Sequence, residues 1–241
     1  MRELDWGHPN IRDLGGLPTP LSPTGLTIAG RVARGPRREL LAASGWTAAA
    51  DWGLNSIVDL RNENEIGART TDPAAAPPSH VSIAHAPTED QTHPEFRAVC
   101  MPILDSPEYW QHNLRILPAQ VAATLEAIAV SRPGVLVHCS AGRDRTGMVS
   151  ALLLGNAGVS ADDIVADYSA SVRAMAGRGT HAAPTADRQA SWTPDQVEVW
   201  LADVEPHVRD FVAGLDEALT RVSTTARARR RLRDLLTRPD A

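Results

Sequence analysis

The chain has 241 residues, of which 43% are hydrophobic and 22% are charged, and its formal net charge is −5. This composition is ordinary for a folded globular protein and excludes a wholly disordered chain. The negative balance gives no reason to expect nucleic-acid binding, and no apolar run is long enough to span a membrane. We expect a single domain over residues 1–241. No signal peptide is recognised, so we expect a cytoplasmic location, with export by another route left open.

The first half of the chain alternates predicted strands and helices. Strands are predicted over 25–35 (a pair broken at a glycine), 56–60 and 80–86. Helices are predicted over 39–52, 63–68, 107–117 and 118–131. Residues 87–96 are polar and are expected to form a turn-prone loop. Ser106 can cap the third helix and Pro107 suits its first position, while Pro118 separates it from the fourth.

The second half begins with PGVLVHC, a short unalternating apolar run that is typical of a strand buried on both faces of a parallel sheet. Helices are predicted from Arg145 to near Gly155 or Gly158, after the capping pair Ser160 and Asp163, after Thr193, and in the basic segment 226–238. We expect the arginines of the basic segment to face solvent, with a partner-binding or phosphate-steering role as the alternative. Residues 177–191 are predicted as a mobile loop. These elements predict an α/β fold in which residues 176–241 form a helical annex or lid rather than an independent domain.

The chain has two cysteines, Cys100 and Cys139. Cys100 and Cys139 cannot form a disulfide framework or a CxxC zinc site, so each is judged by its surroundings. Cys100 has neither an arginine nor a helix start at a suitable spacing, and we expect an inert buried thiol. All 24 basic residues are arginine, which indicates a coding bias rather than local choices of a guanidinium.

Cys139 lies in HCSAGRDRTG, at the carboxyl end of the buried strand and just before a helix that starts near Arg145. The intervening residues must therefore curl tightly, as Gly142 permits, with their N–H groups pointing inward at a helix N-terminus. Such a pocket suits a tetrahedral dianion such as phosphate or sulfate. Arg145 has the planar fork that holds two phosphate oxygens, and the same positive field favours a thiolate at Cys139.

A thiolate beneath a bound phosphate monoester is placed for in-line attack, giving a phosphocysteine that water hydrolyses without any metal or cofactor. Arg145 and the loop amides would stabilise the charge of the transition state. The Thr146 hydroxyl would ease departure of the thiolate, and His138 would orient the loop.

The sequence HCSAGRDRTG resembles the signature of the cysteine-dependent tyrosine phosphatase superfamily, His-Cys-x5-Arg-Ser/Thr-Gly. The segments NIRDLGGL (10–17), IVDLRNENEI (57–66) and DIVADYSAS (163–171) resemble its bacterial and fungal branch, which includes a secreted mycobacterial phosphatase. The resemblance implies a mostly parallel sheet flanked by helices. It implies hydrolysis of phosphotyrosine in proteins, with phosphoserine, phosphothreonine or phosphoinositides as further substrates. It makes Cys139 the nucleophile, Arg145 the phosphate clamp, and the backbone of Ser140, Ala141, Gly142, Arg143 and Asp144 the cradle.

Two further features follow from this resemblance. The branch usually has lysine where Arg143 stands, a residue associated with inositol phosphates, and the arginine keeps the charge while leaving that activity undecided. Charged residues at motif positions are expected to form buried ion pairs that brace the phosphate loop; they are Arg12, Asp13, Asp59, Arg61 and Glu65.

The proton donor to the leaving oxygen must be a carboxyl group within hydrogen-bond reach. Asp90 is favoured, because it follows the 80–86 strand where related enzymes carry an aspartate, and Glu89, Asp144 and Asp105 remain alternatives. Trp192 and Trp200, after the 177–191 loop, are expected to be core residues, with a cover over the pocket as the alternative.

Two other functions stay open on the sequence. Arsenate reduction or sulfur transfer also uses a cysteine in an anion loop, although the small arsenate reductases carry that loop near the chain start. A catalytically inactive phosphate-binding module would recognise phosphorylated partners, although retention of both Cys139 and Arg145 argues against it. The physiological substrate and the oligomeric state are not determined by the sequence.

Overall fold

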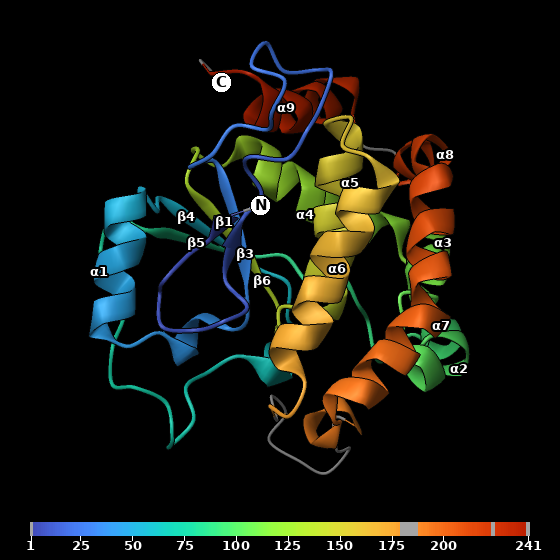
Figure 1. Cartoon of the computed structure of the whole chain (residues 1–241), viewed down its shortest axis with the longest axis horizontal. Coiled ribbons are helices and arrows are strands. Elements are labelled where there is room, and N and C mark those ends of the chain that lie inside the picture. The colour runs from blue at the N-terminus through green and yellow to red at the C-terminus, as the bar shows by residue number, and fades with distance from the viewer. Residues whose placement is uncertain (1, 179–187, 223–224, 240–241) are drawn as a thin grey trace.

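The computed structural model describes residues 2–178, 188–222 and 225–239, and its core is a mixed sheet (Figure 1). The strand order in that six-stranded sheet is β1-β2-β3-β6-β4-β5. The last four strands in this order run parallel, whereas β1 and β2 are antiparallel additions at one edge. The predicted α/β class with a mostly parallel sheet is confirmed. The strand bounds are β1 Arg2–Glu3, β2 Arg12–Asp13, β3 Val32–Gly35, β4 Ser56–Asp59, β5 Ser82–His85 and β6 Val135–His138.

Helices cover both faces of the sheet (Figure 1). The helix α1 lies on one face, and the remaining helices gather on the other, with α9 at the end of the molecule that carries the C-terminus. The helix bounds are α1 Ala43–Trp52, α2 Pro94–Val99, α3 Tyr109–Ile116, α4 Pro118–Val130, α5 Asp144–Asn156, α6 Ala161–Met175, α7 Pro194–Ala213, α8 Leu215–Arg221 and α9 Ala226–Thr237.

The period-2 alternation of strand side chains divides the apolar residues into two cores. Ile57 and Leu136 point to the α1 face, where they pack with Trp46. Val58 and Val137, one residue further along each strand, point to the opposite face and join the larger core. Strands covered on both faces need apolar residues at every position, which is why β6 reads as an unbroken apolar run.

The sheet brings three strand ends together where β6 ends. Its register pairs His138 with Gly35 of β3 and with Asp59 of β4. Parallel strands end at the same edge of the sheet, so the segment that follows His138 emerges between residues of both neighbours. Ligands of open α/β sheets bind at this edge.

Several predicted boundaries are confirmed by the termini of the helices. Gly53 ends α1 in the left-handed conformation, with φ of 101°. The Ser160 side chain accepts the amide of Asp163 at the start of α6. Thr193 and Gln196 form a capping box at the start of α7.

Other expectations about local structure were wrong. In the 25–35 segment only the second half is a strand; Leu26 makes an isolated bridge with Pro18, because a chain turn at 29–30 separates it from β3. The turn-prone loop 87–96 runs into α2, which His93 caps and Pro94 begins. The acidic helix 63–68 is reduced to a 3-10 turn, Glu63–Glu65. Most of the predicted mobile loop, 179–187, lies outside the described residues.

The C-terminal helices pack on the rest of the fold. The basic helix α9 buries Leu232, Leu235 and Leu236 and contacts α4 and α5. Trp192 and Trp200 pack together with ring centroids 5.3 Å apart, against the larger core. Within the described ranges, none of the helices has the length and apolarity that crossing a membrane requires.

Candidate active site

The loop between β6 and α5 has a shape that only glycine allows at its centre. Gly142 has φ of 71°, in the left-handed region. A Cβ on Gly142 would lie 2.4 Å from the carbonyl group of Gly35 and 2.6 Å from the nitrogen of Pro36. The loop therefore presses against the end of β3, and it cannot move away without losing its curl.

The carbonyl oxygens of this loop are all held from outside. Ser140 O accepts the Arg37 amide at 3.0 Å, and Ala141 O accepts Asn10 Nδ2 at 2.9 Å. Gly142 O accepts Arg34 Nη2 at 2.6 Å. By contrast, the amides of 140–142 donate to no atom of the described residues. A loop whose carbonyls are bound outward and whose amides are free is an anion-binding nest.

Asp167, on α6, anchors the side chains that hold these carbonyls. Its carboxylate accepts Arg12 at 2.9 Å and also pairs with Arg34. Arg12 donates in turn to Asn10 Oδ1 at 2.7 Å. Although burial opposes ionisation, Arg34 and Arg12 hold the pKa of Asp167 below its ordinary value. One buried carboxylate thus fixes both side chains that support Ala141 and Gly142.

Arg145, in the first turn of α5, is buried and points toward a carboxylate on another segment. Its guanidinium forms a two-pronged ion pair with Glu65, at 2.5 and 2.7 Å. Glu65 also accepts the Asn62 amide in the capping box of the 3-10 turn, so its carboxylate is fixed from both sides. The sequence predicted Glu65 as a brace for the loop, and the structure gives it direct contact with Arg145.

Cys139 is buried, with 2% of its surface exposed, and lies within electrostatic reach of the Arg145 guanidinium. Burial opposes the charge of Arg145, yet the neighbouring Glu89 and Glu65 raise its pKa above the ordinary value. A negative charge at Cys139 acts in the same direction. A buried thiol thus lies beside a nest of free amides and within the field of a fixed arginine.

The sequence of this chain is similar to those of known proteins. A sequence model described as the tyrosine phosphatase family matches residues 6–233. The chain belongs to the tyrosine phosphatase family. The triple specificity protein phosphatase PtpB of Mycobacterium tuberculosis is 29% identical over 195 residues, which cover 70% of this chain and 68% of that protein. A tyrosine-protein phosphatase of Nostoc commune is 39% identical over 72 residues, 30% of this chain and 24% of that protein.

A second cluster of charges lies under the strand end of this phosphatase. Asp59 accepts Arg61 Nε at 2.9 Å and pairs with Arg38, and His138 Nε2 lies 3.7 Å from the same carboxylate. Burial lowers the pKa of His138 to about 4, so the imidazole is neutral at pH 7. His138 Nδ1 lies 3.1 Å from Cys139 O, which suits an orienting role.

The other acidic residues of the motifs lie in different settings. Asp13 was expected to brace the phosphate loop; instead it accepts the amides of Gly15 and Gly30 and the indole N–H of Trp52. It holds the connection from β2 to β3. This expectation was wrong because the alternation of β2 sends Arg12 and Asp13 to opposite faces.

The candidate proton donors are separated by the fold. Asp144 is the first residue of α5, 17% exposed, and accepts Arg143 Nε at 3.0 Å. Glu89 is buried with Oε1 3.7 Å from Arg145 Nε, and burial raises its pKa above the usual range. Asp90 accepts the amide and hydroxyl of Thr92 at 2.8 and 2.6 Å, and these bonds lower its pKa.

The remaining predicted residues have the following settings. Thr146 Oγ1 is buried with no hydrogen-bond partner in the described part of the chain. Asp105 is half-buried, and its backbone carbonyl accepts Gln189. Cys100 is fully buried, and burial raises the pKa of its thiol to about 11.

Sequence reasoning missed three residues that hold the loop: Asn10, Arg34 and Asp167. Asn10 lies in the motif NIRDLGGL and Asp167 in the motif DIVADYSAS. A polar residue within each of these partly apolar segments was the signal available in the sequence. Arg34 is fully buried within β3, and a charged residue in a buried strand was the corresponding signal there.

Proposed function

We propose that this tyrosine phosphatase hydrolyses phosphate monoesters through a phosphocysteine at Cys139, without metal or cofactor. The observation that supports this most strongly is the loop 140–142, whose carbonyls are all bound outward while its amides remain free beside a buried thiol. Such a nest supplies donors to the three equatorial oxygens of a phosphoryl group, and also accepts a phosphate or sulfate ion.

In the first step, the Cys139 thiolate attacks phosphorus and a sulfur–phosphorus bond forms as the bond to the leaving oxygen breaks. The backbone of Ser140, Ala141, Gly142, Arg143 and Asp144 cradles the phosphoryl oxygens, and the Arg145 fork binds two of them. In the second step, water attacks phosphorus and the thiolate departs. The unpartnered hydroxyl of Thr146 is available to donate to that sulfur.

We assign the proton donor to Asp144 in place of Asp90. Asp144 belongs to the loop itself and is partly exposed, so its carboxyl group is accessible to a leaving oxygen above the phosphate. The Asp90 carboxylate is held by Thr92 with a lowered pKa, which disfavours a proton donor at neutral pH. Glu89 has a raised pKa but is buried against Arg145, which suits a role in positioning that arginine. Asp105 stays the weakest candidate.

The proposed class of substrate is inferred from membership of the tyrosine phosphatase family. We propose phosphotyrosine in proteins as the preferred substrate, with phosphoserine, phosphothreonine and phosphoinositides as weaker ones. The relative from Mycobacterium tuberculosis is named for triple specificity. In this chain the Arg143 guanidinium is buried and paired with Asp144, which leaves less charge for additional phosphates of an inositol ring. We further propose that the chain is one domain, including the annex 176–241, and that it acts in the cytoplasm.

The test uses p-nitrophenyl phosphate with a chelator present. We expect turnover by the native chain, none by Cys139→Ser, and full activity of Cys100→Ser, the matched thiol control. Activity that requires added metal would contradict the mechanism. Phosphate binding without turnover would support the inactive module instead.

The proton donor is tested by pH profiles of kcat/KM for Asp144→Asn, Glu89→Gln and Asp90→Asn. We expect only Asp144→Asn to lose the basic limb of the bell-shaped profile. Loss of that limb in Asp90→Asn, with Asp144→Asn unchanged, would restore the assignment made from the sequence.

A further inference from the structure

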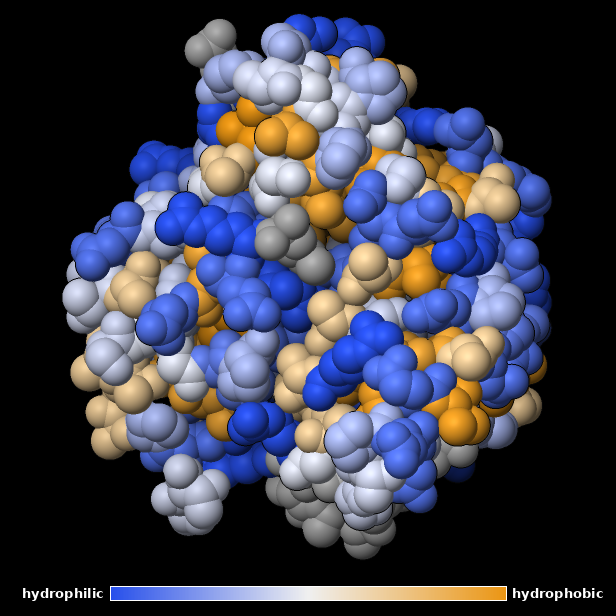
Figure 2. Space-filling model, viewed as in Figure 1, coloured by the Kyte–Doolittle hydropathy of each residue, from blue (hydrophilic) through white to orange (hydrophobic). Residues whose placement is uncertain are grey.

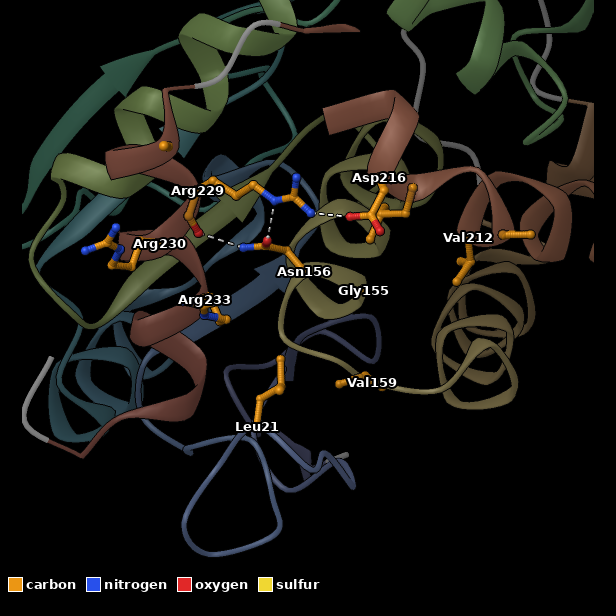
Figure 3. A pocket seen from close by; sticks show the side chains of 12 residues that line it. Leu21, Gly155, Asn156, Val159, Val212, Asp216, Arg229, Arg230 and Arg233 are labelled. Carbon is orange, nitrogen blue, oxygen red and sulfur yellow. Dashed lines mark hydrogen bonds and ion pairs between the residues drawn. The ribbon is translucent and has the colours of Figure 1, made fainter. Parts of the chain in front are cut away.

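A cavity lies at the end of α5 that is far from the phosphate loop. Its volume is about 580 Å³, within the range of small-molecule sites. It is bounded by α9, the end of α5, the α7–α8 junction and the loop that carries Leu21 (Figure 3). Asp144 begins α5 at the phosphate loop and Asn156 ends it at this cavity, so the two sites are separated by about 18 Å.

One wall of the cavity is basic. Arg229, Arg230 and Arg233 line it from α9, a helix that carries five arginines and one aspartate in a chain of net charge −5. Arg229 is held in place, since its Nε donates to Asn156 Oδ1 at 3.2 Å and its Nη2 pairs with Asp216 (Figure 3).

The other two arginines of this wall are available to a ligand. The Arg230 guanidinium makes no hydrogen bond or ion pair with any residue that the structure describes. Arg233 has Asp234 at 3.9 Å, at the limit of an ion pair. Both arginines are exposed. The cavity therefore presents two positive charges that are not fully neutralised by the protein.

The facing wall is apolar. Val159 and Leu215 line it, and Leu21 leaves 43% of its surface exposed at its edge. Apolar side chains lie open below the α9 region in the upper part of Figure 2, with hydrophilic side chains around them. An uncovered leucine beside a cavity gains free energy when an apolar group covers it.

We propose that this cavity binds an amphipathic anion, meaning an aliphatic chain with a single carboxylate or phosphate head. The head would pair with Arg230 and Arg233, while the chain would cover Leu21 and Val159. A free inorganic anion would leave the apolar wall bare, and a neutral chain would leave the two arginines without a counter-charge. This site is independent of the proposed catalytic mechanism, because none of its residues contacts the phosphate loop.

The test is isothermal titration calorimetry on the Cys139→Ser chain, which cannot turn over a phosphate. The ligands are dodecanoate and dodecyl phosphate, below the concentrations at which they form micelles, with acetate, inorganic phosphate and dodecyl maltoside as partial ligands. We expect one or both of the charged chains to bind, and the partial ligands to bind at least about tenfold more weakly. Comparison of the two charged chains identifies the preferred head group.

Matched variants locate the site. Arg230→Ala with Arg233→Ala is expected to weaken binding about tenfold or more, and Leu21→Asp is expected to do the same. Arg227→Ala with Arg231→Ala removes the same charge from exposed positions of α9 that do not line the cavity, and should change the affinity less than about twofold. Equal losses in the two double variants would overturn the proposal in favour of general electrostatic attraction.

A final variant separates this site from the phosphate loop. Arg145→Ala should leave binding of dodecanoate unchanged. Loss of binding in Arg145→Ala would show that the ligand occupies the phosphate loop, and the absence of any binding by either charged chain would likewise overturn the inference. Neither result would bear on the turnover of p-nitrophenyl phosphate by the native chain.

Discussion

At the scale of single residues, the site depends on how Arg145 is held before substrate arrives. The two-pronged contact with Glu65 fixes the plane of the guanidinium, and a rigid fork loses little entropy when it binds phosphate. Glu65 is itself fixed by the Asn62 amide. The orientation of Arg145, the proposed phosphate clamp, is thus fixed by a 3-10 turn 80 residues away in sequence.

Glu65→Gln tests this arrangement. Glutamine can still accept the Asn62 amide in the capping box but loses the charge that pairs with Arg145. We expect kcat/KM for p-nitrophenyl phosphate to fall about tenfold to a hundredfold, with little change in the free energy of unfolding. Glu63→Gln, on the exposed side of the same turn, is the control and should keep native kinetics.

Gly142→Ala tests the shape of the loop. The new Cβ would meet the Gly35 carbonyl group, so we expect loss of activity and a decrease of about 3 kcal/mol or more in the free energy of unfolding. Gly25→Ala has nearly the same φ, 74°, with open space around its Cβ, and should lose only about 1 kcal/mol. Equal losses in urea denaturation of both variants would show that backbone conformation alone matters.

At the scale of secondary-structure elements, α6 acts through Asp167. The helix binds neither the thiol nor Arg145, yet its buried carboxylate orients Arg12 and Arg34, which come from β2 and β3. Three elements thereby hold the carbonyls of a fourth segment. The donors that hold the loop therefore depend on a carboxylate from a different element.

Asp167→Asn should therefore damage both stability and activity. Two buried arginines would lose their counter-charge, and we expect a decrease of about 3–5 kcal/mol in the free energy of unfolding by urea. Activity should fall because the carbonyls of Ala141 and Gly142 lose fixed donors. Asp162→Asn, an exposed residue five positions earlier on α6, is the control and should change stability by less than about 0.5 kcal/mol. A stable, inactive Asp167→Asn chain would contradict the structural part of this argument.

At the scale of the whole molecule, the sheet buries a neutral histidine at the point where its strands end. His138 has a pKa of about 4 in the folded chain against 6.5 in its ordinary setting, because burial disfavours the imidazolium. Between these two values the unfolded chain binds the proton and the folded chain does not. Stability must therefore fall as the pH decreases from about 6.5 to 4.

The expected loss over that interval is up to about 3 kcal/mol from this residue. The measurement is the free energy of unfolding by urea at a series of pH values. His138→Asn cannot take up the proton and should show a flatter dependence between pH 6.5 and 4. An unchanged slope in that variant would assign the effect to other groups.

Some elements of this fold have clear local signals in the sequence, and others do not. The strand β6, the helix α5 and the curl at Gly142 were predictable, because an unbroken apolar run, an apolar helical segment and a glycine are local signals. The first half of the 25–35 segment and the helix α2 were not. The first of these segments is interrupted by a turn, and the second becomes helical because His93 caps it. In both cases the local preference of the residues for helix, strand or loop is too weak to decide the structure.

By itself, the sequence determined the kind of loop that follows His138 and its chemical character, because these depend on residues close together in the chain. Only the tertiary structure decided which distant residues complete it. Asn10 and Arg34 reach the loop from two other segments, and Asp167 holds Arg34 in place. The Asp90 carboxylate is held by its own neighbour Thr92. The physical reason is that local propensity acts along the chain, whereas the partner of a buried charge is chosen by the packing that removes it from water.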